Sequence, residues 1–281
     1  MAKEHPVHGD IYVIAPTRGL RLIDPLELWR WRELFLALIV RDVAVRYKQT
    51  AIGIAWVGLQ PLVMVAIFTF LFEKVGNVPT SGLPYPLFAF AAMVPWQVFS
   101  KSLMEGSMTL VSNRALVTKV YFPRILMPAA AVFGGVVDFA ITLVILVGMM
   151  FWFGFVPGWQ IVLTPLLLLL ALFTSLGVAL WLSALNILYR DVQIVLPFLA
   201  QIWLFLTPVL YPASVIPEPW RLLYAMNPMV TVTESFRWAV LGGAPAPEPL
   251  MLGISTFTAF VILLSGIAYF RHVEREMADR I

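Results

Sequence analysis

The residues of this chain that could do catalytic chemistry are few and widely separated. No Gly-Lys pair occurs, so the sequence lacks the G-x-x-x-x-G-K-[ST] loop that holds the phosphates of ATP. The three histidines are His5, His8 and His272, and without a third nearby ligand they do not predict a metal site. The absence of cysteine excludes disulfides, iron–sulfur clusters and thiol catalysis. We therefore expect no catalytic residue, and no metal or cofactor bound by this chain.

One acidic residue stands apart, because Asp138 lies deep within the apolar stretch FGGVVDFAITLV. A carboxylate is costly in lipid, so it should face the protein interior and be paired or protonated. Two interpretations remain open. Asp138 could form a proton or cation site, or it could make a hydrogen-bonded contact between helices that Gly134 and Gly135 allow to approach closely. The lack of a second buried acid or base for a relay favours the contact.

The composition identifies the environment in which these residues must lie. Of 281 residues, 60% are hydrophobic and only 12% are charged, against roughly a quarter charged in a typical soluble domain. Such a chain cannot form a water-soluble surface. Its formal net charge of +3 also argues against a nucleic-acid-binding protein. We therefore predict an all-α integral membrane protein.

Long uncharged intervals predict six transmembrane helices. A helix rises about 1.5 Å per residue, so roughly 20 apolar residues cross the hydrocarbon core of a bilayer. The predicted spans are 51–72, about 85–102, about 125–153, about 160–188, 192 to near Tyr211 and Pro212, and 249–270. This divides the chain into a cytoplasmic segment 1–50, a six-span domain 51–270 and a tail 271–281.

The distribution of basic residues predicts the orientation of these spans. An even number of spans places both termini on one side, and cytoplasmic flanks carry the excess of Lys and Arg. Sixteen of the nineteen basic residues lie in the segments that share a side with the termini, and only Lys74, Arg221 and Arg237 lie on the other side. Both termini should therefore be cytoplasmic. The first 50 residues show no cleavable signal-peptide pattern.

Two segments outside the spans also predict helices. Residues 25–40, PLELWRWRELFLALIV, suit an amphipathic helix in the headgroup region, or one packed on a partner or on the spans. Between the fifth and sixth spans, prolines and glycines interrupt residues 213–247 too often for a further span. We expect two short helices there, about 218–226 and 229–241, re-entering the outer leaflet. Their aromatic residues equally fit an interfacial aromatic belt.

Two stretches of the chain resemble type-2 ABC transporter permeases that export polysaccharides. The first is LALIVRDVAVRYKQTAIGIAWVGLQPLVMVAIFTFLF, with Arg-Asp, Arg-Tyr-Lys, Gly-x-x-Trp and a proline in the first span. The second is SALNILYRDVQIVLPFLAQIWLFLTPVLYP, followed by NPMVTVTESFRWAVL. The likeness covers roughly residues 30–272. It looks greatest to the O-antigen and teichoic-acid exporters, and capsule exporters look more distant.

The resemblance implies the permease of an ATP-driven exporter in the bacterial inner membrane, acting in lipopolysaccharide biosynthesis. Its expected partners are a second copy of itself, two ATP-binding cassette ATPase subunits that bind ATP and Mg, and a lipid-linked polysaccharide. The resemblance places a substrate channel along the first and fifth spans, lined by Trp56, Phe68, Phe72, Phe198, Phe205 and Tyr211. It places an outer gate at Trp220, Tyr224, Phe236 and Trp238, and ATPase contacts at Asn113, Arg114, Lys119 and Arg190.

Other interpretations of the same residues remain open. Each aromatic residue could simply face lipid, and the cytoplasmic cations could be solvated or paired within the chain. A capsular polysaccharide is an alternative substrate. An ion-coupled flippase would need Asp138 as its coupling site. A membrane glycosyltransferase or phosphotransferase would need clustered carboxylates, whereas Glu105, Asp191, Glu234 and Glu248 are expected on both sides of the membrane.

Overall fold

The computed structural model describes residues 29–48, 53–72, 79–189 and 191–280. In these ranges the chain is helical and contains no strand. The helices are α2 (Arg32–Lys48), α3 (Gly53–Leu71), α4 (Tyr85–Ser112), α5 (Arg114–Lys119), α6 (Leu126–Phe133), α7 (Gly135–Trp152), α8 (Thr164–Leu188), α9 (Val192–Phe205), α10 (Glu218–Ala225), α11 (Pro228–Leu241) and α12 (Pro249–Arg280), with short 3-10 helices η2 (Trp159–Leu163) and η3 (Ala213–Val215).

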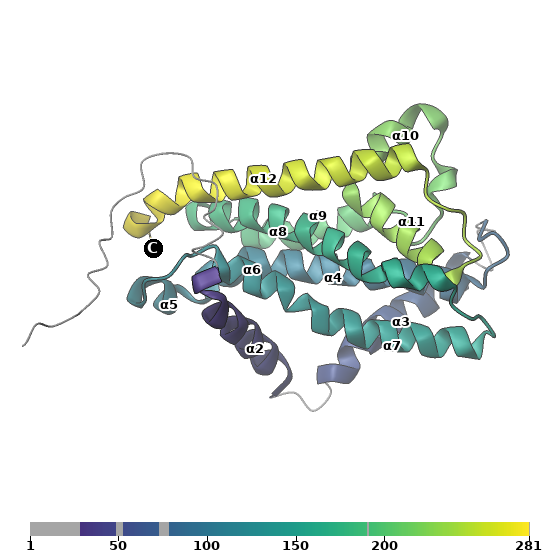
Figure 1. Cartoon of the computed structure of the whole chain (residues 1–281), viewed down its shortest axis with the longest axis horizontal. Helices are drawn as coiled ribbons and strands as arrows, with labels where there is room; N and C mark the ends of the chain where they lie inside the picture. Colours follow the sequence, from purple (N-terminus) through teal and green to yellow (C-terminus); the bar gives the residue numbers. More distant parts are fainter. Residues whose placement is uncertain (1–28, 49–52, 73–78, 190, 281) are drawn as a thin grey trace, which may run out of the picture.

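Helix α4 forms the centre of the bundle. It packs against α6, α7, α8 and α11, and α4, α7, α8 and α12 run roughly along the long axis of the molecule (Figure 1). Its most apolar window is 78% buried, against 17% for α3 and 22% for α12. Helices α3 and α12 are therefore peripheral, and each leaves a broad apolar face uncovered.

The predicted spans are confirmed in part. Among the described residues, five helical stretches are long and apolar enough to cross a membrane, namely α3, α4, α6 with α7, η2 with α8, and α12. The predicted fifth span holds α9, which has 14 residues and reaches only about 21 Å at the rise of an α-helix. Helix α9 ends at Phe205, where the backbone turns. Side chains of other helices hydrogen-bond to the backbone carbonyl groups that follow.

Two boundaries differ from the sequence prediction. Helix α4 continues to Ser112, about ten residues past the predicted end of the second span at residue 102. It can do so because its charged residues Lys101 and Glu105 find partners of opposite charge in the bundle. The predicted amphipathic helix at 25–40 is present from Arg32 and extends to Lys48 as α2, while residues 25–28 lie outside the described ranges.

The two predicted outer helices are present as α10 and α11, and local sequence explains their boundaries. The Asn227 side chain accepts a hydrogen bond from the Met229 amide, and Pro228 occupies the first turn, where no amide donor is needed. Helix α11 ends at Gly242, whose φ of 63° is the left-handed conformation that favours glycine. Helix α11 packs against α4, α8 and α12, so it belongs to the core of the bundle.

Helices α8 and α12 approach closely through two glycines. A Cβ atom on Gly177 would lie 2.7 Å from the backbone nitrogen of Leu263, and a Cβ atom on Gly266 would overlap the Gly177 carbonyl. Nearby, the rings of Trp181 and Tyr269 stack with centroids 4.1 Å apart. Small residues at such crossings give membrane helices their packing contacts, because lipid provides no hydrophobic drive between helices.

Replacing Gly266 with valine should separate α8 from α12. The added side chain meets helix backbone, which cannot rotate away, so we expect a loss of at least about 2 kcal/mol of stability. The matched control is Gly253→Val on the same helix, because a Cβ there meets no atom within 4 Å. Thermal unfolding in detergent, followed by tryptophan fluorescence, compares the two variants. Equal unfolding midpoints would contradict the close crossing.

Candidate functional site

Asp138 lies at the centre of a buried charge cluster. Its side chain is 3% exposed, and it accepts hydrogen bonds from Arg46 Nη1 at 2.7 Å and Lys101 Nζ at 3.0 Å. The Tyr47 hydroxyl donates to the same carboxylate, and Arg46 also pairs with Glu105. Two acids and two bases thus neutralise one another at the junction of α2, α4 and α7.

This cluster corrects one sequence expectation. No second buried charge was expected near Asp138, yet the fold brings Arg46 and Lys101 to it from 92 and 37 residues away. The geometry is that of a contact between helices, since both carboxylate oxygens already have donors. Burial and the hydrogen bond to Asp138 raise the pKa of the Tyr47 hydroxyl above its usual range. Tyr47 therefore stays protonated and acts as a donor.

The proposed channel residues divide into two groups. Trp56 on α3 and Phe198 and Phe205 on α9 are exposed, so each can touch something outside this chain. Phe68 and Phe72 instead pack toward the core. Their rings stack with centroids 5.8 Å apart, and Phe72 lies 6.1 Å from the Tyr85 ring.

The aromatic residues expected at the outer gate also have different surroundings. The Tyr224 hydroxyl lies 3.0 Å from the hydroxyl of Tyr211, the sixth residue expected in the channel, and burial raises the pKa of Tyr224 above its usual range. Trp220 is exposed and Trp238 is half-buried. Phe236 is fully buried, with its ring edge-on to Phe139 at 5.8 Å, so it packs the core and faces no surface of this chain.

A residue that sequence reasoning counted only as an outer cation proves to be buried. Arg237 on α11 is 1% exposed, pairs with Glu234 at 2.7 Å and lies 3.6 Å from the centre of the Phe88 ring. The spacing of Glu234 and Arg237, three residues apart on a predicted helix, was the available signal. It indicated an ion pair, but it could not indicate burial.

The expected ATPase contacts lie in and before the short helix α5. Arg114 and Lys119 are exposed, and the Asn113 side chain donates to the Thr109 carbonyl at 2.9 Å. Val117 is buried in the cluster that contains Leu110 and Phe122, which fixes α5 against the ends of its neighbours. Arg190 lies outside the described residues. Helix α5 therefore presents cations from a firmly packed support.

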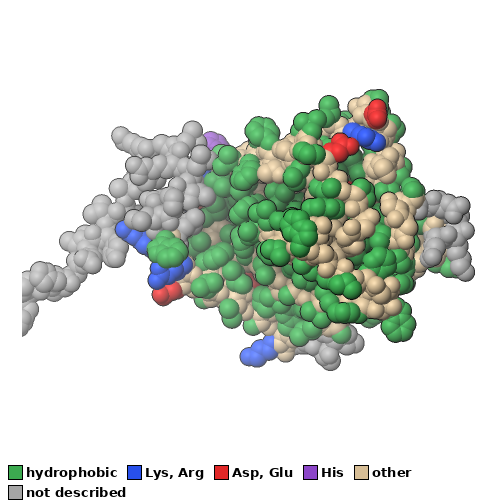
Figure 2. Space-filling model, turned by 45° about the vertical axis from the view of Figure 1, so that its right-hand side comes forward, with side chains coloured by type: hydrophobic (Ala, Val, Ile, Leu, Met, Phe, Trp, Pro, Cys, Tyr) green, Lys and Arg blue, Asp and Glu red, His purple; other side chains and the backbone are tan. Residues whose placement is uncertain are grey.

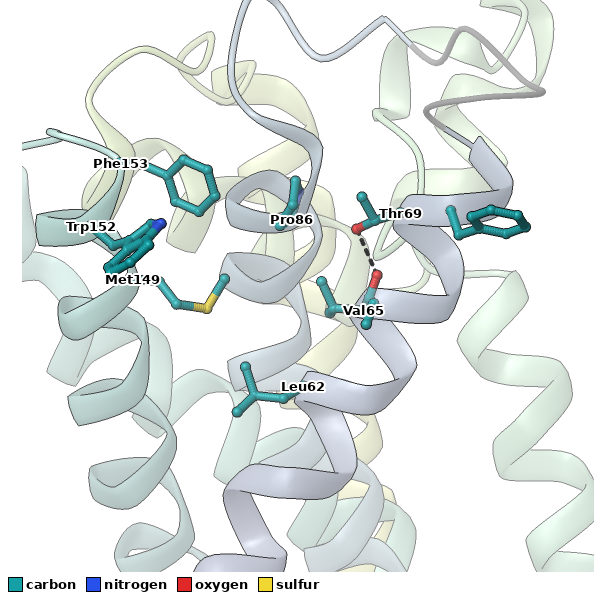
Figure 3. Close-up of a pocket in the computed structure, with 9 residues that line it drawn as sticks. Leu62, Val65, Thr69, Pro86, Met149, Trp152 and Phe153 are labelled. Carbon is teal, nitrogen blue, oxygen red and sulfur yellow. Dashed lines mark hydrogen bonds between the residues drawn. The ribbon is translucent and has the colours of Figure 1, made fainter.

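An apolar cavity lies between α3, α4 and α7 (Figure 3). It has a volume of about 500 Å³. Its lining residues are Leu62, Val65, Ala66, Thr69, Phe70, Pro86, Met149, Trp152 and Phe153. The Thr69 hydroxyl donates to the Val65 carbonyl at 2.7 Å, so this polar group is already engaged within α3. Such a cavity is poorly suited to bind a sugar.

The arrangement as a whole defines a multi-pass helical membrane protein. Apolar side chains cover most of the surface seen in Figure 2, and the few charged groups lie toward its margins. In the described part of the chain, no three His, Cys, Asp or Glu residues are grouped as metal ligands.

Comparison with known proteins specifies the family. Residues 33–241 match the family described as ABC-2 type transporter, so the chain belongs to this family, as its sequence resemblance implied. The O-antigen export system permease protein RfbA of Myxococcus xanthus is 31% identical over 260 residues, covering 91% of this chain and 98% of the relative. A Klebsiella pneumoniae protein of the same name is 26% identical, covering 88% and 94%. The polysialic acid transport protein KpsM of Escherichia coli is 24% identical, covering 86% and 93%.

The charge cluster predicts that substitution of Asp138 greatly lowers the stability of the protein. Asp138→Ala leaves Arg46 with one partner fewer and Lys101 without its carboxylate, and removing one member of a buried ion pair costs about 3–5 kcal/mol. The control is Asp42→Ala, which removes the more exposed pair with Arg41 and should cost less than about 1 kcal/mol. Thermal unfolding in detergent measures both. A smaller loss for Asp138→Ala than for Asp42→Ala would refute the role of the cluster.

Proposed function

We propose that this chain is the permease subunit of an ATP-driven exporter that moves a lipid-linked polysaccharide across the bacterial cytoplasmic membrane. Similarity over about nine-tenths of its length to proteins named O-antigen export permeases carries this proposal. The substrate is of the O-antigen or teichoic-acid type. A capsular polysaccharide is the second candidate, supported by the weaker similarity to a polysialic acid transport protein.

ATP hydrolysis belongs to separate subunits in this proposal. The sequence has no phosphate-binding loop of its own, and the family is one of transporters. Two ATP-binding cassette subunits dock on the cytoplasmic side, where Arg114 and Lys119 of α5 are exposed. Asn113 and Arg190 are the other two residues that we expect to contact these subunits. The support is the position of α5, which is packed between the ends of α4 and α6 and can transmit force to both.

The proposed orientation places both termini in the cytoplasm. Its support is the excess of Lys and Arg on the segments that flank the termini. Figure 1 places α2, α5 and the C-terminal end of α12 toward one end of the bundle, and α10 toward the other. Helices α10 and α11 re-enter the outer leaflet in this arrangement, and α2 lies along the inner leaflet.

Two copies of the chain enclose the channel along α3 and α9. Trp56, Phe198 and Phe205 are exposed on these two helices and can stack on passing sugar rings. Each such contact contributes only about 1 kcal/mol, so the glycan is held and still slides. Phe68 and Phe72 support this wall from behind. Tyr211 lines the outer end of the channel. Trp220, Tyr224 and Trp238 form the outer gate, and Phe236 packs behind it.

An ion-coupled flippase is less compatible with the geometry. The coupling candidate that the sequence offers, Asp138, is engaged by two cations and a tyrosine hydroxyl. In inside-out vesicles that contain the permease and its ATPase, our proposal therefore expects transport to require ATP. Collapse of the proton gradient by a protonophore should leave the rate unchanged, and loss of transport would support ion coupling instead.

Deletion of the gene tests the proposed function in cells. We expect long-chain glycan to disappear from the surface and lipid-linked glycan to accumulate inside, because synthesis continues without export. Immunoblotting of intact and lysed cells distinguishes the two pools. Normal surface glycan in the deletion strain would exclude this role.

Removing one exposed aromatic of the channel should slow export. Phe198→Ala on α9 loses a stacking surface for sugar rings, and we expect export to fall several-fold at unchanged membrane insertion. Phe257→Ala on α12 is the matched control, because Phe257 is 70% exposed and Phe198 62% exposed, on different helices. Surface glycan and immunoblots of membranes measure the two quantities. Equal export by the two variants would show that Phe198 does not line the channel.

A further inference from the structure

The backbone from the end of α9 to the first residue of η3, residues 206–213, is here called the exit segment. Most of it is not helical, and its neighbours are apolar, so its carbonyl groups need partners from elsewhere. Arg237 Nη2 donates to the Pro208 carbonyl at 2.8 Å and to the Val209 carbonyl at 3.3 Å. The Tyr85 hydroxyl donates to the Leu210 carbonyl at 2.9 Å. Side chains of α11 and α4 thus determine where this segment lies.

Arg237 is bound on every side of its guanidinium group. Its Nε donates to the Phe88 carbonyl at 3.2 Å, its Nη1 donates to Glu234 at 2.7 Å, and its plane lies over the Phe88 ring. Glu234 also accepts from the Ala213 amide at 3.1 Å, at the far end of the exit segment. Only a planar group with several diverging donors can connect these partners at once, and a lysine ammonium has no such fork.

The exit segment carries Tyr211, the channel residue that meets Tyr224 of the outer gate. The Tyr211 hydroxyl donates to the Phe205 carbonyl at 2.6 Å and lies 3.0 Å from the Tyr224 hydroxyl of α10. The position of Tyr211 relative to α10 therefore depends on the anchoring of the exit segment. That anchoring comes from Arg237, Glu234 and Tyr85. At the start of the segment, the Asn227 side-chain amide adds a hydrogen bond to the Leu206 carbonyl at 3.0 Å.

We propose that Arg237, together with Glu234 and Tyr85, is a positioning residue for glycan export. It holds the exit segment so that Tyr211 meets Tyr224 at the outer end of the substrate path. Arg237 does not touch the glycan, because it is buried, and it acts through the tyrosine pair. The role in transport rests on the proposed function, whereas the anchoring of the segment does not.

A single introduced cysteine reports on the anchoring. The chain contains no cysteine, so Leu210→Cys places the only thiol in the exit segment, where Leu210 is 3% exposed. In purified protein in lipid nanodiscs, a maleimide should label this thiol slowly. Adding Arg237→Met should accelerate labelling at least tenfold, and Arg237→Lys should give an intermediate rate. The control Arg221→Met, which removes the exposed pair with Glu248, should leave the rate unchanged.

A separate pair of introduced cysteines checks that the rest of the fold is intact. The hydroxyls of Thr231 on α11 and Ser255 on α12 lie 2.6 Å apart, so Thr231→Cys with Ser255→Cys should form a disulfide with or without Arg237→Met. If the disulfide does not form in the presence of Arg237→Met, the milder variant Glu234→Gln takes the place of Arg237→Met in the labelling test. Glu234→Gln should accelerate labelling of Leu210→Cys about threefold. Unchanged labelling in the folded variant would overturn the anchoring.

Export measured with the same variants tests the transport role. Arg237→Met should lower surface glycan at least fivefold at equal protein level, and Tyr224→Phe should lower it also. Because both changes act on one contact, their combination should be little worse than Arg237→Met alone. Full export by Arg237→Met would overturn the positioning role. A double variant whose loss of export equals the product of the two single losses would overturn it as well. Absence of export by the unaltered chain would instead refute the proposed function and leave the labelling result standing.

Discussion

A charge that lies inside an apolar bundle must be neutralised where it lies, and this requirement governs the structure. Asp138 meets it through Arg46, Lys101 and Tyr47, and Glu105 meets it through Arg46. Without these partners each ion would carry a desolvation penalty of several kcal/mol. The cluster therefore fixes α2 against α4 and α7. It also lets α4 continue past Ser102 while carrying charged residues.

The same requirement acts a second time near the beginning of α4. Arg237 is buried there with Glu234 and three backbone carbonyl groups as partners. Helix α4 is thus held by polar contacts at Phe88, near its beginning, and at Lys101 and Glu105 in its second half, and by apolar packing between them. Helices α3 and α9 contain no charged residue, so no ion pair fixes them in this way, and their exposed aromatic side chains are available to other molecules. A well-packed centre beside a loosely covered face is compatible with the proposal that two copies of the chain enclose the path.

Much of the fold follows from local features of the sequence. The uncharged runs predict the long helices because crossing a bilayer demands length and apolarity alone. Pro217, Pro228 and Gly242 predict the limits of α10 and α11, because proline and glycine act on the backbone at their own positions. The predicted fifth span ends near Tyr211 and Pro212, whereas helix α9 ends at Phe205 and the carbonyl groups of Pro208 and Val209 beyond it are bound by Arg237 of α11. That interaction leaves no trace in the hydropathy of the segment.

The sequence by itself determined the membrane class, most helix boundaries, the family and the absence of a phosphate-binding loop, because each depends on composition or on residues close together in the chain. Only the tertiary structure decided which side chains meet. It paired Asp138 with Arg46, buried Phe236 and Arg237, and left Trp56 and Phe198 exposed. The physical reason is that burial and charge pairing depend on helices packed side by side. Such neighbours can be 92 residues apart in the chain, as Arg46 and Asp138 are.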